Sequence, residues 1–179
     1  VELSRCFLSA IPSEEVIESA INKGKQYRLV EQTGIPYPVT HYPESLKDIE
    51  RIKHEVEYPA FIKPYYSHIW ADRFANKGFK VDNTTQLVQK FGEVLEANLE
   101  ALVQSVVVGP DSNIFELYAY MSEEHEAVAT FVTRKLRQYP NDFGVGTCMI
   151  STHDEDICKI GVRFLQGIGY RGLGSIEFK

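Results

Sequence analysis

The stretch of sequence that decides the fold is Tyr58-Pro59-Ala60-Phe61-Ile62-Lys63-Pro64. Its short apolar run predicts a buried strand, with Lys63 on its last residue emerging at the edge of the sheet before a proline. A lone ammonium group in apolar company needs a partner, and a point charge with several donors suits the oxygens of a polyphosphate. The alternative interpretation is an ordinary solvated surface lysine.

The elements on both sides of this strand predict more sheet and helix. Apolar residues recur every three to four positions over Glu44–Val56, which is typical of an amphipathic helix that packs on a sheet. No period is visible between Pro64 and Gly78. The chain then predicts a strand at Phe79–Val81, a helix at Thr84–Ala97 and a near-continuous apolar strand at Ala101–Val108.

The C-terminal part predicts a hairpin followed by a strand, a helix and a strand. The hairpin pairs Ile114–Tyr120 with Ala127–Thr133 through a polar turn. The later elements are a strand at Gly144–Ile150, a helix at Asp154–Gln166 and a strand at Gly172–Phe178. Helices that alternate with hairpins predict an α+β fold of two lobes, with a hinge near Asp82–Asn83 or Val107–Gly109.

The N-terminal part predicts an extended segment and two helices. Arg5–Ala10 is expected to be a strand or an arm, and Ser13 is expected to cap a first helix. A second helix is predicted from Asn22 to Thr33, because Gly34 supplies the left-handed residue that ends a helix. Lys23 therefore lies in the first turn of a helix, where it is either a second phosphate-binding cation or a solvated lysine.

The composition of the 179 residues excludes several classes of protein. Hydrophobic residues make up 44% and charged residues 25%, which indicates a folded domain. The net charge of −6 argues against duplex DNA or an anionic membrane as partner. The three cysteines have no CxxC spacing, so we expect reduced apolar fillers in a cytoplasmic protein. No apolar run reaches the ~18 residues of a membrane span.

The segment Val103–Asp111 runs from an apolar strand into a Gly-Pro-Asp turn. Such a strand edge could offer a carbonyl and an amide to a flat purine, with the carboxylate of Asp111 on ribose hydroxyls. The alternative interpretation is a core strand followed by an ordinary turn.

Two further groups of charged residues occur in the C-terminal part. Arg134, Lys135 and Arg137 are expected to gather at the end of a strand, either to neutralise a phosphorylated intermediate or as a solvated rim. Glu177 alternates with Ile176 and Phe178, so its carboxylate faces the other side of the strand. It is either part of a wet face or a magnesium ligand, and magnesium needs at least one more acidic oxygen donor.

Taken in order, these segments resemble the ATP-grasp ligases, especially the subgroup near carbamoyl-phosphate synthase and D-aspartate ligase. The resemblance covers Ile21 to the end of the chain. Its most specific parts are Asn22-Lys23 ahead of Gly34-Ile35-Pro36-Tyr37-Pro38, then Tyr58 to Pro64, Val103 to Asp111, and Gly169 to Phe178.

The resemblance implies an α+β fold of two lobes with a nucleotide cleft between antiparallel sheets. It implies that residues 1–20 end a preceding domain or form an arm, 21–107 form the N-terminal lobe with its lid, and 108–179 form an incomplete C-terminal lobe. The implied activity is an ATP-dependent ligase that converts a carboxylate into an acyl phosphate for attack by an amine or another nucleophile. The implied partners are ATP, Mg²⁺ and a small carboxylate such as an amino acid, with a homodimer as the default assembly.

The resemblance also implies roles for individual residues. Lys23 and Lys63 would contact the ATP phosphates, and Asp111 would hold the ribose. Glu177 would be a magnesium ligand. The remaining implied site residues are Gln104 in the cofactor site, the backbone of Ser105 and Val107 at the adenine edge, and Lys135 and Arg137 near the transferred phosphate or the acceptor.

Two departures from the family pattern bear on turnover. The family covers the triphosphate with a glycine-rich loop, whereas Tyr65–Lys77 contains no glycine. Within it, His68 and Trp70 are interpreted as packing residues. The second departure is that the chain opens at Val1 and stops at Lys179 directly after a strand, so we expect a segment excised from a longer polypeptide that lacks further metal ligands. The alternative function is a catalytically weak module that acts as a nucleotide sensor or scaffold.

Overall fold

The computed structural model describes residues 10–141 and 143–179, which form two compact units. The N-terminal unit is Glu18–Val108, and the C-terminal unit joins Gly109–Lys179 to the segment that ends at Ile17. The division falls within the expected hinge Val107–Gly109. The other expected hinge, Asp82–Asn83, lies within the N-terminal unit. Asn83 caps a helix there by accepting from the backbone N–H of Gln86 at 3.0 Å.

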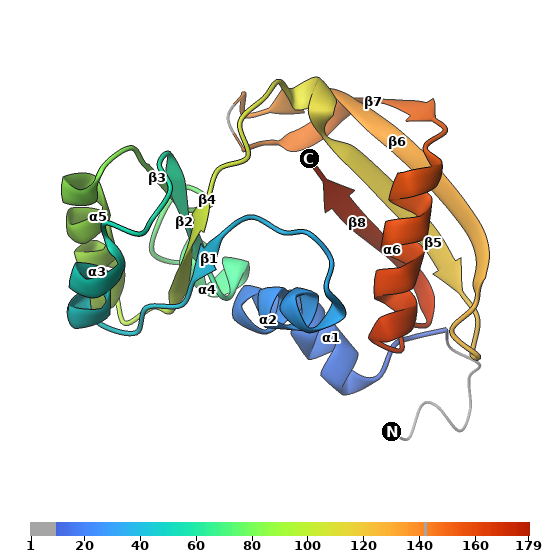
Figure 1. Ribbon diagram of the computed structural model, residues 1–179, viewed down its shortest axis with the longest axis horizontal. Helices are drawn as coiled ribbons and strands as arrows, with labels where there is room; N and C mark the ends of the chain where they lie inside the picture. Colours follow the sequence, from blue (N-terminus) through green and yellow to red (C-terminus); the bar gives the residue numbers. More distant parts are fainter. Residues whose placement is uncertain (1–9, 142) are drawn as a thin grey trace. The chain divides into compact units, whose positions relative to one another are not determined.

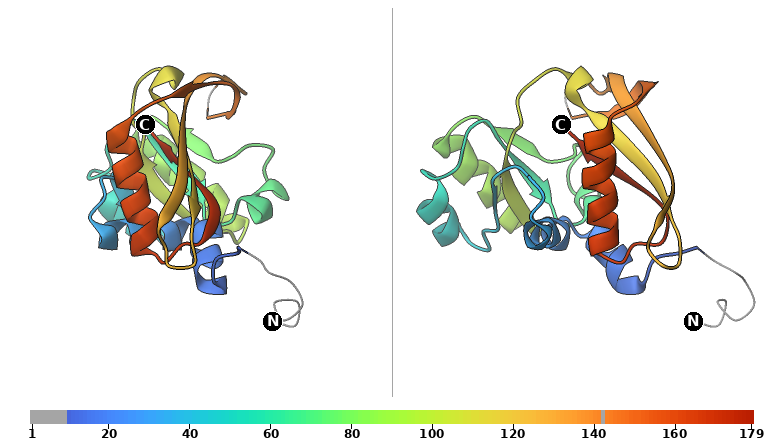
Figure 2. Two further views of the ribbon diagram at one scale, coloured as in Figure 1. Left: turned by 90° about the vertical axis from the view of Figure 1, so that its right-hand side faces the viewer. Right: turned by 45° about the vertical axis from the view of Figure 1, so that its right-hand side comes forward.

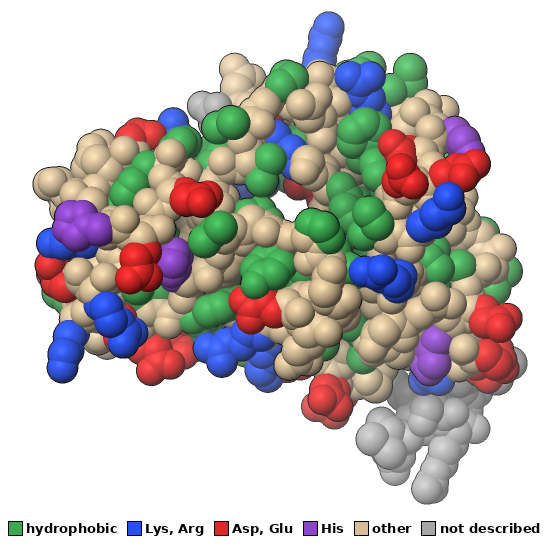
Figure 3. Space-filling view, viewed as in Figure 1, with side chains coloured by type: hydrophobic (Ala, Val, Ile, Leu, Met, Phe, Trp, Pro, Cys, Tyr) green, Lys and Arg blue, Asp and Glu red, His purple; other side chains and the backbone are tan. Residues whose placement is uncertain are grey.

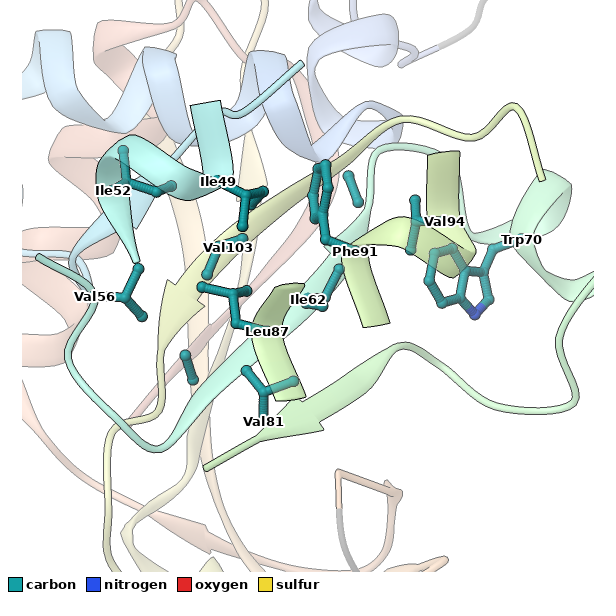
Figure 4. Packing of buried hydrophobic residues seen from close by; sticks show 12 residues of the cluster. Ile49, Ile52, Val56, Ile62, Trp70, Val81, Leu87, Phe91, Val94 and Val103 are labelled. Carbon is teal, nitrogen blue, oxygen red and sulfur yellow. The ribbon is translucent and has the colours of Figure 1, made fainter. Parts of the chain in front are cut away.

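The N-terminal unit is built on an antiparallel sheet with the strand order β1-β4-β2-β3. Its strands are β1 (Thr40–His41), β2 (Ala60–Pro64), β3 (Phe79–Val81) and β4 (Ala101–Ser105). Helices α3 (Leu46–Ile52) and α5 (Thr84–Glu96) pack on one face of this sheet. Their contact encloses a core whose largest members include Ile49, Ile62, Leu87, Phe91 and Val103 (Figure 4). Each such side chain contributes about 1.5–3 kcal/mol relative to an exposed one.

The first two helices begin and end as local signals predict. In α1 (Glu14–Ile21), the hydroxyl of Ser13 accepts from the N–H of Val16 at 3.3 Å. In α2 (Lys23–Thr33), the side chain of Asn22 accepts from the N–H of Lys25 at 3.0 Å. Gly34 ends α2 with φ of 66°, a left-handed conformation in which a Cβ would be strained.

The C-terminal unit is built on a second antiparallel sheet, in the order β7-β6-β5-β8. Its strands are β5 (Phe115–Met121), β6 (Ala127–Tyr139), β7 (Val145–Thr152) and β8 (Gly172–Phe178). Helix α6 (Glu155–Gly167) lies against one face of this sheet (Figures 1 and 2). A Cβ at Gly161 would collide with Leu117, so this glycine permits close contact between helix and sheet.

Several elements differ from the sequence-based expectations. The stretch without a visible period contains helix α4 (Ser67–Ala71), which is too short to show a period, and the short strand β1 and the 3₁₀ turn η2 (Asp111–Asn113) were not expected. Strand β4 ends at Ser105 and not at Val108. Strand β6 continues to Tyr139, so the basic cluster lies inside a strand and not at its end. Lys63 is followed by Pro64 within β2, because an antiparallel strand accepts a proline at its end.

Two other expectations concern residues at the surface or outside the described chain. The predicted strand or arm at Arg5–Ala10 and the thiol of Cys6 lie outside the described residues, apart from Ala10. Cys148 and Cys158 are free thiols, but Cys148 is exposed on the edge strand β7, so the expectation of a buried filler is wrong for it. None of the helices in residues 10–141 and 143–179 has the length and apolar character needed to cross a membrane.

Candidate functional site

Lys63 projects from β2 and is held by two uncharged partners. Its Nζ donates to Oε1 of Gln104 at 2.6 Å and to the hydroxyl of Tyr27 at 3.1 Å. The ammonium also lies 5.3 Å from the centroid of the Tyr27 ring, a cation–π distance. In the described part of the chain, Lys63 forms no ion pair with a carboxylate. No carboxylate among the described residues neutralises it, so an anion could pair with it.

Lys23 lies in the same unit, at the point where α2 begins beside the end of β2. The backbone N–H of Lys23 donates to the carbonyl of Tyr65 at 3.0 Å, and its Nζ donates to the hydroxyl of Ser67 at 3.0 Å. Gly24 makes this approach possible, because a Cβ there would lie 2.7 Å from the ring of Tyr65. The structure therefore brings the start of α2 onto the segment that follows Lys63.

The ammonium group of Lys23 is influenced by two further lysines. Burial lowers the pKa of Lys23 below its ordinary value, and the positive charges of Lys63 and Lys77 lower it further. We call Lys23, Lys63 and Lys77 the lysine cluster. Like charges this close repel one another, and an anion bound among them would relieve the repulsion. The cluster is thus suited to a polyphosphate.

The segment expected to hold adenine is divided between the two units. The N–H of Ser105 donates to the carbonyl of Val39 at 2.9 Å, so this amide is already engaged. Val107 lies beyond the end of β4 and is 40% exposed, and within the described chain its N–H makes no backbone hydrogen bond. Asp111 belongs to the C-terminal unit, where its Oδ1 accepts from Nε2 of Gln138 at 2.8 Å.

In the C-terminal unit, Lys135 and Glu177 form an ion pair. Lys135 Nζ lies 2.9 Å from Glu177 Oε2, and the Lys135 side chain is 3% exposed while that of Glu177 is 59% exposed. Arg137 does not share this position. The register pairs Lys135 with Met149 and Arg137 with Cys148. Met149 and Cys148 are adjacent on β7 and point to opposite faces of the sheet, so the two residues that pair with them do so as well. The bulge in β6 thereby separates the two cations that sequence spacing had grouped.

Glu116 is a candidate that sequence reasoning missed. The register of β5 and β8 sets Glu116 directly opposite Glu177, on the face away from α6. Its carboxylate accepts from the hydroxyl of Tyr118 at 2.8 Å, and this hydrogen bond raises the pKa of Tyr118. The alternation of side chains in Phe115–Met121 already indicated on which face of the strand Glu116 lies, but only the strand pairing shows that Glu116 is opposite Glu177.

Two facing carboxylates fit a divalent metal in part. Magnesium in proteins is commonly bound by one or two carboxylates together with substrate phosphates. Glu116 and Glu177 would meet that requirement on the protein side. Over residues 10–141 and 143–179, no group of three or more His, Cys, Asp or Glu side chains is placed to hold a metal ion without such help. The Lys135 ammonium contacts Oε2 of Glu177, and Oε1 is left to accept a metal ion.

The segment Tyr65–Lys77 packs on its own aromatic residues. Trp70 is 1% exposed, its ring lies 4.6 Å from Phe74 and 5.2 Å from Phe79, and its Nε1 donates to Asn76 at 3.0 Å. The expected packing role of Trp70 is therefore confirmed. His68 is exposed, and its ring meets the ring of Tyr66 edge-on, so the same expectation is wrong for it.

The pocket found among the described residues is a poorer candidate. A shallow cavity of about 390 Å³ in the N-terminal unit is lined by Lys53, Thr84, Thr85, Val88 and Gln89, and none of these was predicted to act. It has no convergent charged groups of one sign. On the visible face of the unit that carries α6, charged side chains of both signs are spread among hydrophobic ones (Figure 3).

Comparison with known proteins identifies the fold of the chain. No protein-family model matches the chain. The chain is 27% identical to the D-aspartate ligase of Enterococcus faecium over 190 aligned residues, which include 99% of this chain and 45% of that protein. The chain thus spans less than half the length of this curated relative.

The chain is also similar in structure to proteins whose structures have been solved. The L-amino acid ligase from Bacillus licheniformis matches with a TM-score of 0.63 and 18% identity, over 89% of this chain and 36% of that one. The biotin carboxylase domain of the Hydrogenobacter thermophilus 2-oxoglutarate carboxylase, solved with MgADP, matches with a TM-score of 0.70 and 16% identity, over 93% and 38%. The chain therefore has the ATP-grasp fold, and the α+β fold class predicted from the sequence is confirmed.

Proposed function

We propose that the protein uses ATP to activate a carboxylate, which an amine or another nucleophile then attacks. The observation that carries this proposal is the lysine cluster, three cations without a carboxylate partner in the described N-terminal unit of a chain with the ATP-grasp fold. Phosphoryl transfer depends mainly on positioning and on neutralising the charge of the phosphates. A cluster of lysines without carboxylate partners among the described residues meets this requirement.

The reaction has two balanced steps. An oxygen of the substrate carboxylate attacks the γ-phosphorus of ATP, the bond to the β-phosphate oxygen breaks, and ADP leaves. The amine then attacks the acyl carbon, the bond to the phosphate oxygen breaks with release of inorganic phosphate, and the amine loses a proton. We assign Lys23 and Lys63 to the ATP phosphates, because the positive charge of Lys63 acts on the Lys23 ammonium and neither lysine pairs with a carboxylate in the described part of the chain.

The other residues are assigned as follows. The free amide of Val107 would contact the adenine edge together with the backbone of Ser105, and Asp111 would hold the ribose. Lys135 and Arg137 would act at the transferred phosphate or at the acceptor. Glu177, with Glu116 opposite it, would hold magnesium, which when bound supplies positive charge to the phosphate oxygens.

The proposed substrate class is an amino acid. The support is that the names of two similar proteins, a D-aspartate ligase and an L-amino acid ligase, both specify amino acids. A screen of amino acids as carboxylate and as amine donors, with release of ADP and phosphate as readout, tests this assignment. A homodimer is also proposed, on the default for soluble oligomers, and light scattering tests it.

The central test of the proposal is the affinity for ATP. We expect Lys63→Met to weaken ATP binding by about 10- to 100-fold, the effect of losing one charge-assisted hydrogen bond. The matched control is Lys80→Met, since Lys80 lies on the neighbouring strand β3 and pairs with Asp82 at 3.2 Å. Equal ATP affinity in wild type and Lys63→Met by isothermal titration would refute the proposal.

A second candidate function is a nucleotide sensor or scaffold. It is favoured by the segment Tyr65–Lys77, which lacks glycine and contains helix α4 packed through Trp70. A backbone with side chains at every position approaches a phosphate less closely than a glycine-rich loop does. A sensor binds ATP but releases no ADP when amino acids and amines are supplied, whereas a ligase releases ADP.

A further inference from the structure

A hydrogen-bonded chain crosses three strands of the N-terminal unit and ends at Lys63. Gln104 on β4 lies directly opposite Thr40 on β1 and directly opposite Phe61 on β2, two residues before Lys63. Lys63 Nζ donates to Gln104 Oε1 at 2.6 Å, and Gln104 Nε2 donates to Thr40 Oγ1 at 2.8 Å. The Thr40 hydroxyl donates to the carbonyl of Pro38 at 2.7 Å. Gln104 is only 2% exposed, so water does not compete for its amide.

The carbonyl of Pro38 determines which group donates and which accepts in each of these hydrogen bonds. The carbonyl of Pro38 can only accept, so it takes the hydroxyl hydrogen of Thr40 and leaves the Thr40 oxygen as an acceptor. The amide of Gln104 must then turn its NH₂ group toward Thr40 and its carbonyl oxygen toward Lys63. The opposite orientation would place an NH₂ group against an ammonium, two donors without an acceptor, at a buried position.

The hydrogen bonds of Lys63 also determine how many of its N–H groups remain free. An ammonium has three N–H groups. One is directed to Gln104, and a second is directed to the hydroxyl of Tyr27 at 3.1 Å. With two directions fixed by the protein, the third N–H has a defined direction as well. A long lysine side chain is otherwise free to adopt many rotamers, and ordering it on binding would reduce affinity.

We propose that Gln104 and Thr40 are positioning residues that aim the remaining N–H of Lys63 at a phosphate oxygen of the ligand. The inference rests on the proposed binding of ATP and adds to it a means by which the cation is ordered in advance. Sequence analysis placed Gln104 among the residues that bind the cofactor directly. Both ends of its amide are bonded to protein groups, so Gln104 acts through Lys63.

The experiment measures the affinity of the protein for ATP and for inorganic tripolyphosphate by isothermal titration. Tripolyphosphate reports on the cationic site without the base. Thr40→Val removes the acceptor for Gln104 while keeping the shape of the side chain, and we expect affinity for both probes to fall about tenfold. Gln104→Leu should give a similar loss. Thr40→Ser keeps the hydroxyl and should restore the affinity to the wild-type range.

A double-mutant cycle separates positioning from a structural role. In a Lys63→Met background, Thr40→Val and Gln104→Leu should cause no further loss, because the group they position is absent. If either substitution weakens binding by the same factor in both backgrounds, the positioning role is refuted. If Lys63→Met itself has wild-type affinity for both probes, the proposed function fails at an earlier step, so the two failures are distinguishable. Thermal unfolding of Thr40→Val and Thr40→Ser identifies a loss that comes only from unfolding, and that result also refutes positioning.

Discussion

Lys63 in the N-terminal unit and Lys135 in the C-terminal unit are both lysines on antiparallel strands, but their partners differ. Lys63 is held by the amide of Gln104 and the phenol of Tyr27, which leave its charge intact. Lys135 is almost fully buried and paired with the carboxylate of Glu177 at 2.9 Å. The comparison teaches that ordering a cation and neutralising it are separate tasks. The first lysine has no carboxylate partner in the described part of the chain, and we propose that an anionic ligand supplies one, whereas the second is balanced within the protein.

The strongest way to break this contrast is to remove each lysine in turn. We expect Lys63→Met to weaken ATP binding by about 2 kcal/mol, because a charge-assisted hydrogen bond to the ligand is lost. Lys135→Met should have a smaller effect on ATP affinity, since its charge is already balanced by Glu177. Isothermal titration of both variants measures the difference. A larger loss for Lys135→Met would reverse the assignment of the two lysines.

A second comparison uses a glycine in a helix of each unit. Gly161→Ala in α6 should lower the free energy of unfolding by about 2 kcal/mol, because the new methyl group collides with Leu117 on the sheet. Gly92→Ala in α5 meets no atom within 4 Å and should raise the free energy of unfolding by about 0.5–1 kcal/mol through helix propensity. Urea denaturation measures both changes. Equal effects would show that α6 does not pack as closely as described.

The ion pair of the C-terminal unit gives a third, smaller effect. Glu177→Gln leaves the buried ammonium of Lys135 without a counter-charge and should lower the free energy of unfolding by about 1 kcal/mol, reduced from the value for a buried pair because Glu177 is 59% exposed. The double variant Lys135→Met with Glu177→Gln should recover most of this loss. If the double variant is as unstable as the sum of both single variants, the pair is not coupled.

The smallest effect concerns pH and Lys23. Its folded pKa is lowered, chiefly by burial and then by Lys63 and Lys77, so the unfolded chain binds the proton more tightly than the folded one. Stability should therefore rise with pH between the lowered pKa and the ordinary lysine value. Lys23→Met should be more stable than wild type at neutral pH, with the difference vanishing above about pH 10.5. Urea denaturation at a series of pH values measures this difference, and a gap that widens toward high pH would contradict the sign.

The sequence predicted correctly where helices begin and end when the capping residues lie within a few positions of the helix. Asn22 and Gly34 bound α2 as expected, because capping needs only side-chain oxygens and a left-handed residue within a few positions. The alternation around Glu177 predicted its face correctly, and the register confirms that Ile176 and Phe178 point the other way. Helix α4 and strand β1 were missed, because elements this short show no period.

The sequence predicted individual residues of the candidate site better than it predicted which of them lie close together. Lys23 and Lys63 were singled out, and both belong to the lysine cluster. Glu116 was missed because its partner is far along the chain. Arg137 was grouped with Lys135, but a bulge in β6 breaks the alternation on which that grouping relied.

The order of the residues along the chain was enough to establish the fold class, the helix caps and the two phosphate-binding candidates, since these depend on spacing and on neighbours. The amino-acid sequence could not reveal that a hydrogen bond to Thr40 orients the side-chain amide of Gln104 toward Lys63, or that Glu116 faces Glu177. Those facts depend on strand register, which joins residues distant in sequence, and a shift of one residue would send each side chain to the opposite face of its sheet.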